Sequence, residues 1–427
     1  MARCGAAAAR LLYTTLLRLL MPAYLLRLWR RGGREPGYRQ AMAERFGFYA
    51  AARPLPGMVW LHAVSLGETR AAAPLIDALR AARPGLRLLL THGTATGRDA
   101  GQALLQPGDL QTWLPYDTPG AVQRFLRHFQ PALGVLMETE VWPGLLRGAR
   151  RAGVPMVLAN ARLSEKSLRQ ALRFAVLLRP AAQAVTEVLA QSEADARRLT
   201  EAGARRVQVC GNLKFDMAPP PALLAQGRQW RAMAGRPVVL AAALREGEDG
   251  PLLAAWLQLP QPRPLLLLVP RHPQRFDEVA TAVRQAGLQL RRRSEWTAEP
   301  PADAAAADVW LGDSLGEMPL YYAAADVALL GGSFAPLGGQ NLIEAAACGC
   351  PLLMGPHTFN FATAAADALA AGAAERVADL DAAVSLAAAW AVEPARADRV
   401  QRSLAFAAAH RGATACIAER LLMHLPG

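Results

Sequence analysis

The sequence lacks the motifs that would place it in several large enzyme classes. No G-x-G-x-x-G follows a strand-like run, which argues against a dinucleotide oxidoreductase. Lysine occurs only as Lys166 and Lys214, neither of them in a P-loop pattern, so a P-loop nucleotidase is excluded. The seven histidines form no H-E-x-x-H pair, and no G-x-S-x-G elbow is present. We therefore expect neither a metal nor a cofactor.

Cysteine is also scarce. The chain has five, with no C-x-x-C pair and no spacing typical of a disulfide framework: Cys4, Cys210, Cys348, Cys350 and Cys416. Such spacing is typical of reduced thiols in a cytosolic setting and offers no metal site. We therefore predict that all five are free thiols.

Acidic residues are few compared with basic ones, and the formal net charge is +12. The excess is not spread over the chain, because residues 1–53 hold ten arginines against Glu35 and Glu44. The preference for arginine over lysine is explained by codon usage in a GC-rich genome. A charge confined to one end does not form the basic surface of a nucleic-acid-binding domain, so we expect no nucleic-acid partner.

The basic N-terminal segment is also apolar. Residues 11–34 read "LLYTTLLRLLMPAYLLRLWRRGGR", in which Arg18 and Pro22 interrupt the apolar run. Tryptophan and arginines follow it in place of the small residues of a signal-peptide cleavage site. The pattern favours a helix that lies in the interface of an anionic cytoplasmic leaflet. A single membrane span and a soluble helix packed on the domain remain as alternatives.

The rest of the chain alternates between short apolar runs and helical stretches. This pattern indicates an α/β fold with doubly wound parallel sheets. In the first half the strand-like runs are "GMVWLHAV", "LRLLLTHG", "ALGVLME", "VPMVLANA" and "EVLAQS". In the second half they are "RPVVLAAA", "PLLLLVP", "LQLRR", "DVWLGD", "DVALLGG", "PLLMG" and "ERVA".

At 427 residues the chain is too long for one core, so two domains are expected. The segment 217–226, "MAPPPALLAQ", has three successive prolines and is predicted to be a linker without helix or strand. The predicted organisation is a membrane-associated segment (1–50), an N-terminal domain (51–216), the linker (217–226) and a C-terminal domain (227–427). Within the last of these, one helix is expected to close the second domain and another to return toward the first.

Acidic residues follow two strands of the first half. "WLHAVSLGE" ends at Glu68, and "ALGVLMETE" ends with Glu138 and Glu140. Since the carboxyl ends of parallel strands form the ligand-binding edge, two acidic strand ends indicate proton transfer. Glu68 has a second interpretation, because a glutamate at the start of a helix is favourable to the helix dipole.

The strand ends of the second half are basic or rich in glycine. "LLLLVPRHPQRF" presents Arg271, His272 and Arg275, which suit a phosphate. "GGSFAPLGGQNLIEAAACG" (331–349) combines two glycine pairs with a helix start, whose amides can bind an anion, and with Glu344, which can bind ribose hydroxyls. This half therefore predicts a site for a nucleotide sugar. Asp379 and Asp381 form a D-x-D, for which a helix N-cap is the favoured interpretation over a metal site.

Ordered sequence blocks across nearly the whole chain resemble one family, the 3-deoxy-D-manno-octulosonic acid (Kdo) transferases of lipid A biosynthesis. The blocks are "ERFG" (44–47), "HAVSLGE" (62–68), "LPYD" (114–117), "METEVWP" (137–143), "NARLS" (160–164), "GNLKFD" (211–216), "REGED" (245–249), "PRHPQRF" (270–276), "GDSLGE" (312–317), "GGSF" (331–334), "GGQNLIE" (338–344) and "GPHTFNF" (355–361).

The resemblance implies a GT-B fold, in which two Rossmann-like domains face each other across a cleft. It implies inverting, metal-independent transfer of Kdo from CMP-Kdo to the 6'-hydroxyl of the lipid A precursor, on the cytoplasmic side of the inner membrane. By position in the motifs, Glu68 is the general base, and Glu138 and Lys214 stabilise the transition state. The implied CMP-binding residues are Pro270, Arg271, Gly316, Glu317, Met318, Gly332, Ser333, Asn341, Leu342, Ile343 and Glu344.

The chain departs from the family pattern at Ala243 and Leu244, where relatives commonly have serine and threonine, and at Met318, which replaces a usual leucine. Two other functions fit the same layout. A nucleotide-sugar epimerase of the same fold would need no basic amphipathic N-terminus. A non-catalytic, membrane-bound sensor of sugar nucleotides would tolerate loss of Glu68.

Overall fold

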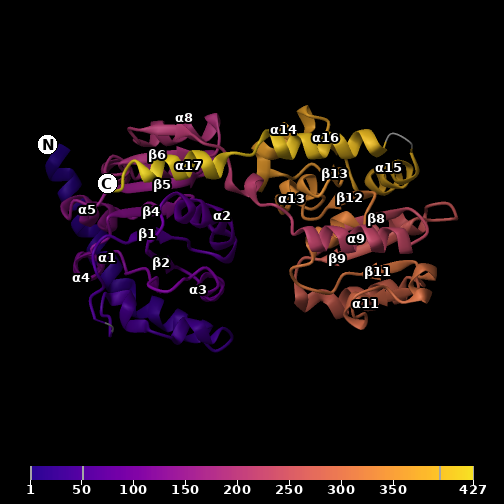
Figure 1. Cartoon of the computed structure of the whole chain (residues 1–427), viewed down its shortest axis with the longest axis horizontal. Coiled ribbons are helices and arrows are strands. Elements are labelled where there is room, and N and C mark those ends of the chain that lie inside the picture. The colour runs from indigo at the N-terminus through magenta and orange to yellow at the C-terminus, as the bar shows by residue number, and fades with distance from the viewer. Residues whose placement is uncertain (1, 51, 394–395, 427) are drawn as a thin grey trace. The chain divides into compact units, whose positions relative to one another are not determined.

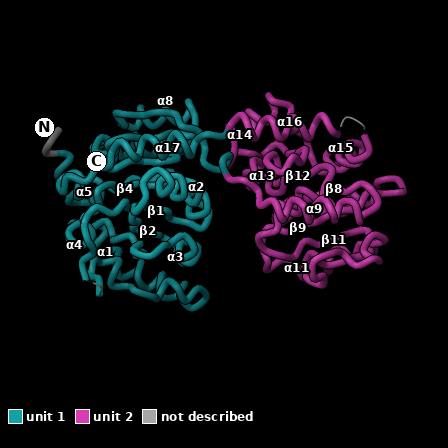
Figure 2. The backbone as a smooth tube through the Cα atoms, viewed as in Figure 1, with its two compact units in different colours: residues 1–216, 411–427 teal, residues 217–410 magenta. Residues whose placement is uncertain are grey.

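The computed structural model describes residues 2–50, 52–393 and 396–426. The chain forms two compact units (Figure 2). Unit 1 comprises residues 1–216 and 411–427, and unit 2 comprises residues 217–410. The chain therefore leaves unit 1 once and returns to it at the end.

Unit 1 is built on a seven-stranded sheet with the order β3-β2-β1-β4-β5-β6-β7, in which every neighbouring pair is parallel. Its strands are β1 (Val59–His62), β2 (Leu88–His92), β3 (Leu110–Trp113), β4 (Leu133–Met137), β5 (Met156–Ala161), β6 (Glu187–Ala190) and β7 (Val207–Val209). Its helices are α1 (Ala2–Arg31), α2 (Leu66–Ala82), α3 (Ala95–Gln102), α4 (Pro119–Phe129), α5 (Pro143–Arg151), α6 (Glu165–Arg173), α7 (Ala175–Ala182), α8 (Glu193–Ala202) and α17 (Ala413–Leu422).

Unit 2 has a second seven-stranded parallel sheet with the order β10-β11-β9-β8-β12-β13-β14 (Figure 1). Its strands are β8 (Val238–Leu244), β9 (Leu265–Pro270), β10 (Leu290–Arg292), β11 (Val309–Leu311), β12 (Val327–Leu330), β13 (Leu352–Met354) and β14 (Ala374–Arg376). Its helices are α9 (Pro221–Met233), α10 (Asp249–Leu257), α11 (Phe276–Gln285), α12 (Met318–Ala323), α13 (Leu342–Ala347), α14 (Ala362–Ala370), α15 (Leu380–Val392) and α16 (Arg396–Ala409).

The central strands are buried along their whole length, as expected for parallel strands covered by helices on both faces. In unit 1 the core joins Trp60 of β1 to Phe125 of α4, Leu145 of α5 and Leu199 of α8. In unit 2 the core includes Trp256 of α10 packed with the sheet. The predicted doubly wound α/β fold is confirmed, and so are all seven strands predicted for the second half.

The order of strands determines where each sheet can bind a ligand. In unit 1 the chain moves outward from β1 through β2 to β3 and then crosses back to β4 on the other side of β1. The loops after β1 and β4 therefore diverge at a topological switch point, where open α/β sheets bind ligands. In unit 2 the loops after β8 and β12 hold the corresponding position.

Two predicted boundaries were wrong. Residues 221–226, assigned to an unstructured linker, form the first half of α9, because Pro221 occupies the first helical position, where a missing N–H is tolerated. Residues 411–427, assigned to the C-terminal domain, belong to unit 1. There α17, the expected returning helix, packs against α2 and β5 and appears as a yellow helix among the purple and magenta elements of Figure 1.

The prediction that all cysteines are free thiols was also wrong. Cys210, which follows β7, forms a disulfide with Cys416 of α17, and their Cα atoms lie 5.5 Å apart. The two residues are separated by 206 positions in the sequence, so no local spacing could reveal the pair. Cys348 and Cys350 are free thiols, and the side chain of Cys4 lies outside the described residues.

Helix α1 is long and exposed, and its residues Gly5–Arg31 are apolar enough to cross a membrane. One face lies on unit 1: the Tyr13 hydroxyl donates to Asp117 Oδ2 (2.8 Å), the Tyr24 ring contacts Tyr116, and Leu28 is buried. Another face leaves large apolar side chains exposed, at Leu11, Leu12, Leu16, Leu19 and Leu20. An apolar face of this kind on a helix indicates association with a membrane.

Candidate active site

Glu68 lies at the switch point of unit 1, in the first turn of α2. Ser65 is the N-cap of this helix and its hydroxyl accepts the backbone N–H of Glu68, while the Glu68 carboxylate accepts the N–H of Val64 (2.7 Å) and the hydroxyl of Ser65 (3.0 Å). The sequence S-L-G-E thus forms a variant of the capping box, in which the Glu68 carboxylate accepts the N–H of Val64 in place of that of the N-cap residue Ser65. The helix-start interpretation of Glu68 is therefore correct, and it holds the carboxylate in a fixed position.

The environment of Glu68 changes its acidity. The pKa of its carboxyl is raised to about 7, chiefly by burial. The hydrogen bonds from Val64 and Ser65 lower the pKa, and the negative charges of Glu138 and Glu140 raise it further. The carboxyl is therefore close to half ionised at neutral pH. A general base works best when its pKa lies near the operating pH.

Glu138 and Glu140 follow β4, as expected from the sequence. Glu138 has a left-handed backbone conformation (φ 57°), which is rare for a residue with a side chain and is often found at functional sites. Its carboxylate lies 3.0 Å from Arg162 Nε and 3.7 Å from Lys214 Nζ, and its side chain is only 13% exposed. Glu140 accepts a hydrogen bond from Trp142 Nε1 (2.6 Å).

Lys214 belongs to a short 3₁₀ helix, Leu213–Asp216, whose position is fixed by buried polar contacts. The N–H of Leu213 donates to Asn160 Oδ1 (3.1 Å), and the N–H of Lys214 donates to Asn212 Oδ1 (3.0 Å). Asn160 is fully buried at the end of β5 with φ 53°. The structure thus brings the predicted residues Glu68, Glu138 and Lys214 to one edge of the sheet, with Glu138 paired to Lys214.

Sequence reasoning assigned no role to two residues of this cluster, Arg162 and Asn160. Both lie in the "NARLS" block, which was noted only as part of the resemblance. Their position directly after the apolar run "VPMVL" was the available signal, because β5 neighbours β4 in the sheet. A polar residue at that strand end must lie beside Glu138.

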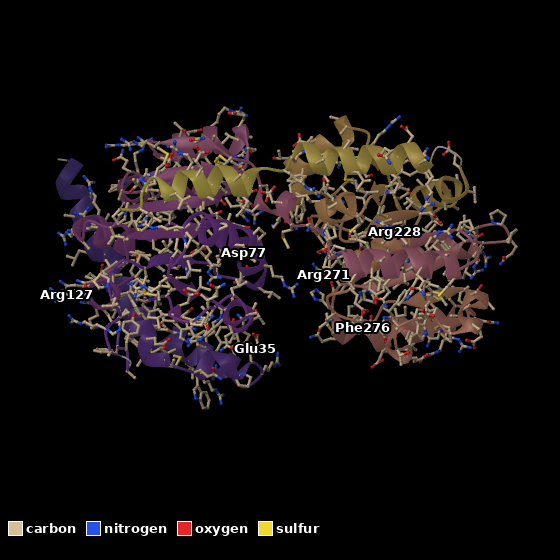
Figure 3. All side chains as sticks on the ribbon, in the orientation of Figure 1. Glu35, Asp77, Arg127, Arg228, Arg271 and Phe276 are labelled. Carbon is tan, nitrogen blue, oxygen red and sulfur yellow. A yellow bond between two sulfur atoms is a disulfide. The ribbon has the colours of Figure 1, made fainter. Side chains whose placement is uncertain are left out.

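In unit 2 the loop after β9 begins at Arg271, labelled in Figure 3. Its backbone N–H donates to the carbonyl of Leu244 (2.9 Å), and its side chain is exposed. Arg271 forms no ion pair with any residue in the described part of the chain. Arg275, by contrast, is buried and paired with Asp249 and Glu278, so its charge is already matched within the protein.

A buried glutamate, Glu248, binds the backbone of the glycine-rich loop that follows β12. The carboxylate of Glu248 accepts four backbone N–H groups, from Arg245, Gly332, Phe334 and Ala335, at 2.8–3.2 Å. A Cβ at Gly331 would lie 2.4 Å from the carbonyl oxygen of Ala243, so this glycine permits close approach of two backbones. The N–H of Gly332 is already bound by the Glu248 carboxylate. Ser333 is buried, and its hydroxyl donates to the carbonyl of Leu330 and accepts the N–H of Gly355.

The remaining predicted donor residues lie on two short helices. Asn341 is the N-cap of α13, and its side chain accepts the N–H of Ile343 (3.2 Å). Leu342 and Ile343 are buried in this helix, and Glu344 in its first turn is half-buried. Gly316 has φ 84° and precedes Glu317, whose carboxylate is paired with Arg293. Met318 begins α12, and Pro270 ends β9. All of these residues follow or end strands of the same sheet.

Two further expectations have direct outcomes. Asp379 is the N-cap of α15, where its side chain accepts the N–H of Ala382 (2.9 Å), so the N-cap interpretation of the D-x-D is confirmed. Leu244, which stands where relatives commonly have threonine, is fully buried in the core of unit 2, and Ala243 beside it has φ 54° within a β-bulge.

Comparisons with known proteins indicate the family that the chain resembles. A family model described as 3-deoxy-D-manno-octulosonic-acid transferase (kdotransferase) matches residues 40–217. The chain is 52% identical to a 3-deoxy-D-manno-octulosonic acid transferase of Bordetella pertussis over 416 residues, which covers 94% of this chain and 96% of the relative. It is 36% identical to that of Haemophilus influenzae over 359 residues, 82% of this chain and 83% of the relative.

Among solved structures, UDP-GlcNAc 2-epimerase from Neisseria meningitidis bound to UDP-GlcNAc is similar in fold, with a TM-score of 0.57. The likeness covers 86% of this chain and 100% of the epimerase, at 15% sequence identity. At that identity it concerns the two-domain GT-B fold alone.

Proposed function

Because the chain belongs to the family of Kdo transferases, we propose that it transfers Kdo from CMP-Kdo to the 6'-hydroxyl of the lipid A precursor. The observation that carries this proposal within the structure is the Glu68 carboxyl, which burial holds at a pKa of about 7 at the switch point of unit 1. A carboxylate of that acidity can accept the proton of a sugar hydroxyl as the hydroxyl attacks.

The reaction is proposed to be a single displacement. The acceptor oxygen loses its proton to Glu68, a bond forms from that oxygen to the anomeric carbon of Kdo, and the bond from that carbon to the phosphate of CMP breaks. One displacement inverts the configuration at the anomeric carbon. Negative charge grows on the departing phosphate, and in this proposal protein cations stabilise it in place of a metal ion.

In unit 1 the Glu138 cluster supports these steps by its charges. Glu138 contacts both Arg162 and Lys214, so it orients two cations at the edge that carries Glu68. Lys214 is held further by the contacts of its helix with Asn160 and Asn212. We assign Glu138 and Lys214 to transition-state stabilisation, with Asn160 as a positioning residue.

In unit 2 the donor is proposed to bind at the carboxyl ends of β9, β11 and β12. Arg271 is the proposed partner of the CMP phosphate, since its guanidinium is exposed and forms no ion pair among the residues that the structure describes. Pro270, residues 316–318 and residues 341–344 are proposed to surround the nucleotide. Gly332 and Ser333 contribute by shaping the loop, because Glu248 and the backbone already bind their polar groups.

The proposed location is the cytoplasmic face of the inner membrane. Contacts of α1 with unit 1 are spread along the helix, from Tyr13 to Leu28, so the helix lies along the unit instead of leaving it. This supports the interfacial interpretation over a membrane span. The exposed leucines would then contact acyl chains, with the arginines at the phosphates.

The test of the function is a product analysis. Purified protein, incubated with CMP-Kdo and the tetraacylated lipid A precursor, is expected to give a product heavier than the acceptor by one or more Kdo residues, together with CMP, as measured by mass spectrometry. Metal chelation should leave the yield unchanged. Release of CMP without any change in the mass of the acceptor would contradict the proposal.

Replacement of Arg271 by alanine is expected to raise the apparent KM for CMP-Kdo about tenfold, equivalent to about 1.4 kcal/mol, with a smaller change in kcat. The matched control is Arg284→Ala. Arg284 is exposed in the last turn of α11, at the opposite edge of the sheet from the strand ends. Steady-state kinetics with varied CMP-Kdo would measure both, and equal KM values for the two variants would remove Arg271 from the donor site.

A further inference from the structure

Unit 1 contains a cavity of about 350 Å³ that the proposed reaction does not use. It lies among α6, α7, α8 and the strands β5 and β6, and its walls include Val141, Leu163, Phe174, Leu178 and Leu199. Among the residues that the structure describes, none with a charged side chain lines it. Pockets of this size are typical of small-ligand sites, and a wall that is mostly aliphatic and aromatic, with Thr139, Ser167 and Gln170 as its polar residues, favours an apolar ligand.

Two chain segments contribute residues both to the cavity and to the cluster of Glu138, Arg162 and Lys214. The loop after β4 supplies Glu138 to the cluster, and its next residue, Thr139, lines the cavity. The segment after β5 does the same, because Arg162 pairs with Glu138 while Leu163 lines the cavity. A single molecule with a polar head and an apolar tail could therefore contact the cluster and the cavity at once.

One wall of the cavity is also part of an exposed apolar surface. Phe174, which joins α6 to α7, lines the cavity and is 51% exposed, and Val176 of α7 is 58% exposed. Helix α7 packs against α1, the helix that carries the row of exposed leucines. The cavity thus lies next to the surface that indicates membrane association.

We propose that this cavity is a subsite for one fatty acyl chain of the acceptor, held while the sugar head of the same molecule lies at Glu68 and Glu138. The inference rests on the proposed function and deepens it, because it assigns the chemistry that selects an acylated acceptor. A partly open apolar pocket of this size beside a polar cluster is suited to a ligand with an apolar chain and a polar head.

The first experiment fills the cavity. Ala171 of α6 lines it, and Ala171→Phe is expected to lower kcat/KM for the tetraacylated acceptor at least tenfold while leaving transfer to an acyl-free glucosamine disaccharide acceptor within twofold of the wild type. The control, Val176→Phe, adds bulk to the neighbouring helix outside the cavity and should change neither value more than twofold. Equal loss on both acceptors, or no loss on either, would overturn the proposal.

The second experiment does not depend on transfer. A palmitic acid with a terminal diazirine, photolysed with the whole protein in lipid nanodiscs, is expected to leave adducts on residues between positions 139 and 204 that mass spectrometry can map. Ala171→Phe should remove these adducts and Val176→Phe should keep them. Adducts confined to α1 would show contact with the lipid surface only and would overturn the proposal.

The two experiments also separate this inference from the proposed function. Absence of Kdo transfer by the wild type to either acceptor would contradict the function, whereas the cross-linking would still report whether an acyl chain enters the cavity. If Ala171→Phe transfers Kdo to both acceptors as the wild type does, the proposed function is retained and the proposed subsite is contradicted.

Discussion

Glu68→Gln is expected to reduce kcat for Kdo transfer by about 10³-fold, within the range that removal of a general base produces. Glutamine is chosen because it also suits the third position of a capping box, so its amide oxygen can still accept the N–H of Val64. The chemistry should therefore be lost while α2 remains capped. Rates in a discontinuous assay of product mass, together with binding of CMP measured by calorimetry, would test this.

The matched control is Ser65→Ala, which removes the N-cap and leaves the carboxylate. It should cost about 1 kcal/mol of folding free energy and retain measurable transfer. Near-normal turnover by Glu68→Gln would take this residue out of the base role.

The pH dependence follows from the same group. The base must be ionised, and its pKa is raised to about 7, chiefly by burial, so kcat/KM should rise with pH through 7 and level off above about pH 8. The folded-state pKa exceeds the unfolded one, so ionisation of Glu68 lowers stability as pH rises through this range. Glu68→Gln should accordingly be no less stable than the wild type at pH 8, as thermal unfolding would show.

The second large effect is expected at Glu248, on the stability of unit 2. Glu248→Ala would leave four backbone N–H groups without their acceptor beneath the loop after β12, and the carboxylate that binds them is only 1% exposed. Loss of a buried acceptor typically costs about 1–3 kcal/mol for each donor left unsatisfied, and relaxation lets water reach some of them. We expect a total loss of about 3–4 kcal/mol.

Urea unfolding followed by tryptophan fluorescence would measure this loss. The neighbour Glu246 is the control, because its side chain is 54% exposed and pairs with Arg245 at the surface. Glu246→Ala should change stability by no more than about 0.5 kcal/mol. Similar unfolding midpoints for the two variants would mean that the four hydrogen bonds do not hold the loop.

In unit 1 the sequence pattern predicted the central strands and missed the two edge strands. The runs of β1, β2, β4, β5 and β6 are continuous and apolar because helices cover both faces of the sheet. The unpredicted strands β3 and β7 lie at the two edges of the same sheet, where half-buried residues such as Gln111 and exposed ones such as Gln208 break the run. Hydrophobicity alone reports burial, and an edge strand is not fully buried.

The candidate site was predictable where it depends on strand order and not where it depends on long-range contacts. Glu68 and Glu138 could be found because each directly follows an apolar run. The role of Glu248 could not be found in this way. Apart from Arg245, the residues whose N–H groups it binds lie 84 to 87 positions further along the chain. For the same reason the sequence did not show that Gly331 packs closely against Ala243, whereas the prediction that the glycine pair admits a phosphate stays a prediction.

The position of α17 has a consequence for how the protein matures. This helix packs on α2, which begins at the capping box of Glu68, and on the 3₁₀ helix that carries Lys214. Asp216 accepts the N–H groups of Gly412 and Thr414, and Glu187 of β6 pairs with Arg420 and His424. A segment that follows unit 2 in the sequence therefore completes unit 1, so a nascent chain can finish folding unit 1 only after unit 2 has been synthesised.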